Sequence, residues 1–101
     1  MVEVYYSSAE QSQNFKGGVC PNKLTISKNV ATVIDNNIVK KFNFNDRGAK
    51  DSRLFIKSTN MPSVIVEAGF ITNEEEAKRC SDPVSQQKLA ENIAESIKTV
   101  I

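Results

Sequence analysis

The chain has 101 residues, of which 40% are hydrophobic and 25% charged, a composition typical of a folded protein rather than a disordered one. Its 13 basic and 12 acidic residues leave a net charge of +1, which excludes the dense basic surface of a nucleic-acid-binding protein or a polybasic membrane anchor. Histidine is absent. This chain alone therefore cannot form a Ser-His-Asp triad, a Cys-His dyad or a histidine-containing zinc site.

The two cysteines, Cys20 and Cys80, lie too far apart in the sequence for a CxxC redox motif, and two thiols are too few for a four-cysteine metal site. We expect two free thiols, with a disulfide between them as the alternative. No apolar run reaches the ~18 residues of a membrane span, and the first residues do not resemble a signal peptide.

The first half of the chain predicts a strand followed by a long helix. Residues 2–6 form a β-rich run, and the polar stretch 7–22, with two adjacent glycines and a proline, is typical of a loop. From Lys23 to Phe42 apolar residues recur every three or four positions, which indicates an amphipathic helix. Residues 43–48 contain asparagines and a glycine and predict the turn that ends this helix.

The second half predicts two strands and two helices. The apolar runs 54–56 and 64–66 are continuous, which is typical of strands covered on both faces in a parallel or mixed α/β sheet. Asn73 is a candidate N-cap for a helix that ends near Cys80. Asp82 followed by a proline begins the last helix, in which apolar residues form a stripe through residue 101.

This order predicts an α/β fold, a three-layer sheet with helices on both faces, of which the chain supplies about three strands and three helices. Such a sheet is small for strands that are covered on both faces, and its first strand begins at Val2. We therefore expect residues 1–101 to be the C-terminal part of a single larger α/β domain.

The stretch TNMPSVIVEAGFITN, residues 59–73, resembles the signature of the zinc-dependent N-acetylmuramoyl-L-alanine amidases of the autolysin and endolysin type. The resemblance continues on both sides. Residues 2–6 look like the family's strand G-V-E-V-Y-Y, residues 46–50 like its N-R-G-V-K turn, and residues 74–90 like its closing pair of helices. Essentially the whole chain is covered, but it corresponds only to the C-terminal half of the family's catalytic domain.

The resemblance implies a peptidoglycan hydrolase of the cell wall or the extracellular space, bacterial or released by phage lysis. Such an enzyme uses a zinc-activated water to cleave the amide between the lactyl group of N-acetylmuramic acid and L-alanine. In the family, two histidines and a glutamate hold the zinc, and all three lie upstream of the strand with which this sequence begins. We therefore expect zinc in the complete domain, none in this chain alone, and no activity from the isolated chain.

Glu67 is the candidate catalytic residue. It directly follows an apolar run, so it is expected at the end of a strand, where open α/β sheets place functional groups. The resemblance implies that it acts as general acid/base for the attacking water and the leaving amine. The structural alternative is a strand-end carboxylate that is exposed or forms a salt bridge.

Four other features have structural explanations that we favour over functional ones. Arg47 is expected to be solvated or paired rather than bound to substrate, and Asn60 to adopt a turn conformation. Gly69 serves a backbone requirement, and the acidic run 74–76 suits the start of a helix better than a metal site.

A second interpretation of the chain is non-catalytic. In that case it is a short product that assembles with a full-length amidase subunit or binds cell wall. The partners expected are peptidoglycan and the missing N-terminal half or a full-length copy, with self-association of the isolated chain, and neither nucleic acid nor a membrane span.

Overall fold

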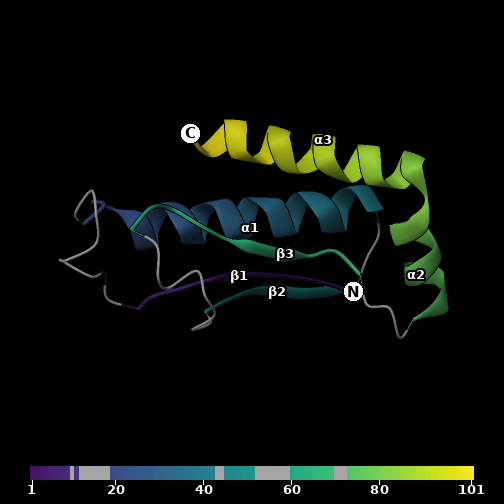
Figure 1. Cartoon of the computed structure of the whole chain (residues 1–101), viewed down its shortest axis with the longest axis horizontal. Coiled ribbons are helices and arrows are strands. Elements are labelled where there is room, and N and C mark those ends of the chain that lie inside the picture. Colours follow the sequence, from purple (N-terminus) through teal and green to yellow (C-terminus); the bar gives the residue numbers. More distant parts are fainter. Residues whose placement is uncertain (10, 12–18, 43–44, 52–59, 70–72) are drawn as a thin grey trace.

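The computed structural model of the chain describes residues 1–9, 11, 19–42, 45–51, 60–69 and 73–101. These residues contain three strands and three helices, which confirms the predicted α/β class (Figure 1). In chain order they are β1 (Val2–Tyr6), α1 (Lys23–Phe42), β2 (Asp46–Asp51), β3 (Ile65–Glu67), α2 (Glu74–Ser81) and α3 (Pro83–Val100).

The three strands form a mixed sheet with β1 in the centre, in the order β2-β1-β3. Strand β2 runs parallel to β1, with Tyr5 opposite Lys50. Strand β3 runs antiparallel to β1, with Val4 opposite Val66. The first strand of the sequence is therefore an inner strand, flanked on both sides by segments that come much later in the chain.

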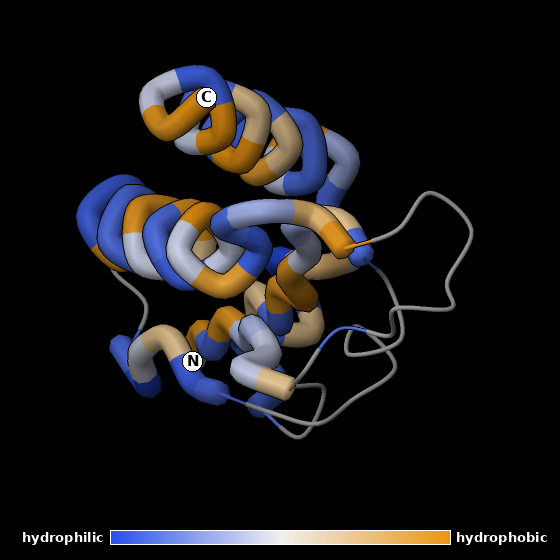
Figure 2. The backbone as a smooth tube through the Cα atoms, turned by 90° about the vertical axis from the view of Figure 1, so that its left-hand side faces the viewer, coloured by the Kyte–Doolittle hydropathy of each residue, from blue (hydrophilic) through white to orange (hydrophobic). Residues whose placement is uncertain are grey.

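Helix α1 covers one face of this sheet, and α3 packs on the outer side of α1 (Figures 1 and 2). The core lies between α1 and β1 and contains Val2, Val4, Val30, Ala31, Ile34 and Ile38, each at most 7% exposed. The α1 members recur at three- and four-residue spacing, so the predicted stripe is the buried one. In the described part of the chain α1 and α3 lie on the same side of the sheet. The helical layer expected on the opposite face of the complete domain stays a prediction.

The turn predicted over residues 43–48 is wrong for its second half, because residues 46–48 begin β2. Backbone pairing with β1 overrides the low strand propensity of these residues. The register between the two strands shifts between Val2 and Val4, and Gly48 has φ +82° in the paired segment of β2. Positive φ is available to glycine at little cost, so Gly48 allows this irregularity. The strand predicted at 54–56 lies outside the described residues.

The helix boundaries predicted in the second half of the chain are confirmed. The side chain of Asn73 accepts a hydrogen bond from the backbone N–H of Glu76 at the start of α2. Asp82 is both the C-cap of α2 and the N-cap of α3, where Pro83 occupies the first turn. None of the helices that the structure describes is long and apolar enough to cross a membrane.

Candidate functional site

Glu67, the predicted catalytic residue, is the last residue of β3, and its side chain is exposed. In the antiparallel register it lies opposite Glu3 of β1. Directly opposite residues of an antiparallel pair point to the same face of a sheet. The neighbouring pair, Val4 and Val66, packs against the core under α1. Because side chains alternate between faces, Glu3 and Glu67 share the face that points away from α1.

Glu3 is the centre of a charged cluster on this outer face, although it is only 4% exposed. Its Oε1 atom accepts from Lys50 Nζ at 3.0 Å and lies 2.5 Å from Arg47 Nε, while its Oε2 accepts from the Tyr5 hydroxyl. These donors, first Tyr5 and then Lys50, lower the pKa of Glu3. The hydrogen bond between the Tyr5 hydroxyl and Glu3 raises the pKa of Tyr5 to about 12, so the phenol stays protonated.

Sequence reasoning did not identify Glu3 as part of the site. The available signal was a carboxylate between two buried valines, in the run Val2-Glu3-Val4. A nearly buried carboxylate needs hydrogen-bond donors. Tyr5, two positions along the same strand, supplies one of them, but Arg47 and Lys50 lie more than forty positions away, on β2.

The other predicted site residues have structural roles. Arg47 pairs with Glu3, in agreement with the paired interpretation, and Asn60 lies half-buried in a bend before β3. The acidic run begins α2, as expected from helix capping. Within it Glu76 is buried and pairs with the amino group of Met1.

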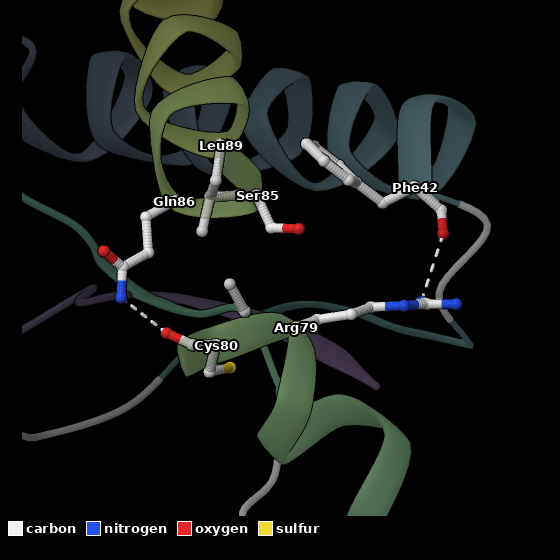
Figure 3. Close-up of a pocket in the computed structure, with 7 residues that line it drawn as sticks. Phe42, Arg79, Cys80, Ser85, Gln86 and Leu89 are labelled. Atoms are coloured by element: carbon white, nitrogen blue, oxygen red, sulfur yellow. Dashed lines mark hydrogen bonds between the residues drawn. The ribbon is translucent and has the colours of Figure 1, made fainter. Parts of the chain in front are cut away.

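A small cavity of about 120 Å³ lies next to Ala68, the residue that follows β3, and between α1, α2 and α3 (Figure 3). Its lining is mostly apolar and comprises Phe42, Ala68, Arg79, Cys80, Ser85, Gln86 and Leu89. The Gln86 side chain donates to the Cys80 carbonyl at 2.7 Å, and Arg79 donates to the Phe42 carbonyl at 3.4 Å. Cys80 and Cys20 are both free thiols, as expected.

The residues that the structure describes do not fit a zinc site. They contain no group of three or more His, Cys, Asp or Glu side chains placed to hold a metal ion, and the sequence has no histidine. Glu3 and Glu67 are neighbours, but Glu3 already binds two cationic side chains. Any zinc bound near Glu67 would need ligands from outside this part of the chain.

The fold agrees with the family indicated by the sequence. It has a mixed sheet, a carboxylate at the end of strand β3, and two consecutive helices at the C-terminus. Residues 2–99 match the family model of the N-acetylmuramoyl-L-alanine amidases, and the chain belongs to this family of cell-wall hydrolases.

Among curated relatives, the chain is 31% identical over 96 residues to the uncharacterized protein YqiI of Bacillus subtilis, covering 94% of this chain and 41% of that protein. It is 33% identical over 92 residues to the N-acetylmuramoyl-L-alanine amidase LytC of the same species, covering 90% of this chain and 16% of LytC. The chain thus spans less than half the length of these relatives.

Solved structures show the same fold. The N-acetylmuramoyl-L-alanine amidase AmiC2 of Nostoc punctiforme superposes with a TM-score of 0.71 at 28% identity, over 97% of this chain and 46% of that one. The CwlD amidase of Clostridioides difficile, solved in complex with the GerS lipoprotein, gives a TM-score of 0.76 at 24% identity, over 98% and 45%.

Proposed function

We propose that this chain forms the C-terminal part, residues 1–101, of a zinc-dependent N-acetylmuramoyl-L-alanine amidase domain and that Glu67 is its general acid/base. The observation that carries the proposal is the position of Glu67, an exposed carboxylate at the end of β3 within the family's signature. The match over residues 2–99 and the amidase activity for which relatives such as LytC are named support peptidoglycan as substrate and the cell wall as the place of action.

In this proposal the Glu67 carboxylate takes a proton from the water that attacks the amide between the lactyl group and L-alanine. It then returns a proton to the leaving amine, so that both halves of the reaction use one carboxylate. Exposure of Glu67 leaves room for the water and the substrate, while pairing of β3 with β1 holds its backbone. Such positioned groups contribute ~10²- to 10⁴-fold to rates.

The zinc belongs to the complete domain in this proposal, and its ligands come from outside the described residues. Alone, the 101-residue chain is expected neither to bind zinc stoichiometrically nor to release L-alanine amino termini from peptidoglycan. That the described residues contain no group placed to hold a metal ion also agrees with a second candidate function. In that case the chain is non-catalytic and docks onto a full-length amidase or binds cell wall. Sedimentation of the isolated chain with purified peptidoglycan sacculi tests wall binding without requiring activity.

The test of the main proposal is Glu67→Gln in the complete amidase domain that contains this sequence. The substitution keeps the shape of the side chain and removes the proton acceptor, so turnover should fall by ~10²-fold or more while zinc content stays constant. Glu75→Gln is the matched control, because Glu75 is an exposed glutamate on α2. Turnover of Glu67→Gln close to that of the unmodified enzyme would contradict the assignment.

A further inference from the structure

The outer face of the sheet holds two cations and two carboxylates, which come from all three strands. Arg47 and Lys50 come from β2, Glu3 from β1 and Glu67 from β3. Both cations contact the Oε1 atom of Glu3, which lies on the central strand directly opposite Glu67. The arrangement therefore places a single carboxylate between the positive charges and Glu67.

We propose that Glu3 is a positioning residue for Glu67, which binds Arg47 and Lys50 on its own carboxylate and so prevents these cations from pairing with Glu67. The inference rests on the proposed role of Glu67 and adds a requirement to it. A carboxylate that transfers protons loses basicity when a cation pairs with it, because the cation stabilises the charged form.

Burial and hydrogen bonds hold the Glu3 carboxylate in one position. Its carboxyl group is nearly buried and is also hydrogen-bonded by the Tyr5 hydroxyl, which occupies the second oxygen. The Arg47 and Lys50 side chains are each 43% exposed, so both have space to reorient if Glu3 no longer holds them. No ion pair joins Glu67 to any residue in the part of the chain that the structure describes.

Charged groups on α2, near the end of β3, are engaged in pairs of their own. Glu76 pairs with the amino group of Met1, and Arg79 lies 3.1 Å from a carboxylate oxygen of Glu75. The cations that removal of the Glu3 charge would release towards Glu67 are therefore those of β2.

The experiment is a titration of the Glu67 carboxyl carbon by ¹³C NMR in the 101-residue chain, which needs neither zinc nor activity. Glu3→Gln should lower the titration midpoint of Glu67 by roughly half to one pH unit, about three- to tenfold in proton affinity. The control Glu74→Gln changes an exposed glutamate on α2 that pairs with Lys78 and should leave the midpoint in place.

Loss of the Glu3 charge also removes a like charge beside Glu67, and a triple variant separates this effect from release of the cations. When Arg47→Gln and Lys50→Gln are added to Glu3→Gln, the midpoint should return towards the original value. A midpoint that stays low in the triple variant, or never moves in Glu3→Gln, overturns the inference.

Because Glu3 is nearly buried, Glu3→Gln is at risk of not folding, and Glu3→Asp is the second variant. Aspartate keeps the charge but is one methylene shorter, so it loses contact with at least one cation. A smaller downward shift of the Glu67 midpoint is expected, and an unchanged midpoint contradicts the inference. If Glu67→Gln leaves amidase turnover intact, the proposed function fails while this titration result stands, so the two failures are distinguishable.

Discussion

A Cβ atom placed on Gly69 would lie 2.9 Å from the Sγ atom of Cys80, which shows how closely the backbone after Glu67 packs against α2. Glu76 lies one turn earlier on the same helix, with its Cβ atom 3.6 Å from the same position. The glycine of the signature is thus required by the approach of a helix, two residues after the candidate catalytic carboxylate. The sequence suggested a backbone requirement at Gly69, but positive φ is found at Gly48 and not at Gly69. The requirement is one of packing, and the thiol of Cys80 is its nearest contact.

Gly69→Ala is therefore expected to destabilise the chain by about 1–3 kcal/mol, the usual range for an overpacked site. Cys80→Ala removes the sulfur, so the double variant should recover most of the loss. Denaturant unfolding of the unmodified chain, the two single variants and the double variant measures the coupling energy between the two positions. Gly48→Ala is the control: no heavy atom lies within 4 Å of its added Cβ and its cost comes from φ +82°, so Cys80→Ala should not rescue it. Additive effects of Gly69→Ala and Cys80→Ala would contradict this explanation.

Asp35 of α1 predicts a pH dependence of stability. It is 3% exposed, and its Oδ1 has no hydrogen-bond partner in the described part of the chain. Burial, followed by the neighbouring Asp46 carboxyl, raises the pKa of Asp35 to about 7. Between its unfolded value near 4 and 7 the folded chain binds more protons than the unfolded chain, so the free energy of unfolding falls as the pH rises through this window.

The expected loss between pH 4.5 and pH 7.5 is on the order of 2–4 kcal/mol from this group. Asp35→Asn has no charge to titrate and should flatten that part of the profile, as measured by urea unfolding at several pH values. Glu91→Gln, an exposed carboxylate of α3, should leave the profile unchanged. A profile of Asp35→Asn parallel to that of the unmodified chain would assign the pH dependence to other groups.

Asp82 stabilises the junction of α2 and α3. Its Oδ1 accepts from the Val84 N–H at 3.2 Å and its Oδ2 from the Ser85 hydroxyl at 3.0 Å. Asp82→Ala should therefore cost about 1 kcal/mol of unfolding free energy, whereas Asp82→Asn keeps a cap acceptor and should cost much less. Thermal unfolding followed by circular dichroism compares the two variants. Equal losses would indicate that charge, rather than capping, is what Asp82 contributes.

The isolated 101-residue chain is expected to self-associate or to dock onto a full-length copy. In the described sheet β2 and β3 are the edge strands, and unpaired edges accept strands from other chains. Apolar side chains at the C-terminal end of α3 are also accessible, with Ile97 37% and Ile101 85% exposed. Sedimentation equilibrium at low micromolar concentration should show oligomers. A monomer with a cooperative melt would mean that this part of the domain is self-sufficient.

Local sequence signals predicted the helices and their ends. The spacing of apolar residues from Lys23 to Phe42 and the caps Asn73 and Asp82 depend on side chains within a few positions of one another, so they are readable without knowledge of the fold. The strand 2–6 and the position of Glu67 after an apolar run are equally local. The catalytic role of Glu67 stays a prediction.

Strand β2 and the ion pairs of Glu3 with Arg47 and Lys50 depended on tertiary structure alone. Residues 46–51 have a turn-like sequence and become a strand only because the inner strand β1 offers unpaired backbone groups to them. The pairing then brings Arg47 and Lys50 to Glu3, and β3 brings Glu67 to its other side. The sequence by itself determined which residues carry charge and which segments are helical. Only the register between distant strands decided which charges meet, because backbone pairing is not specified by the side chains of one segment.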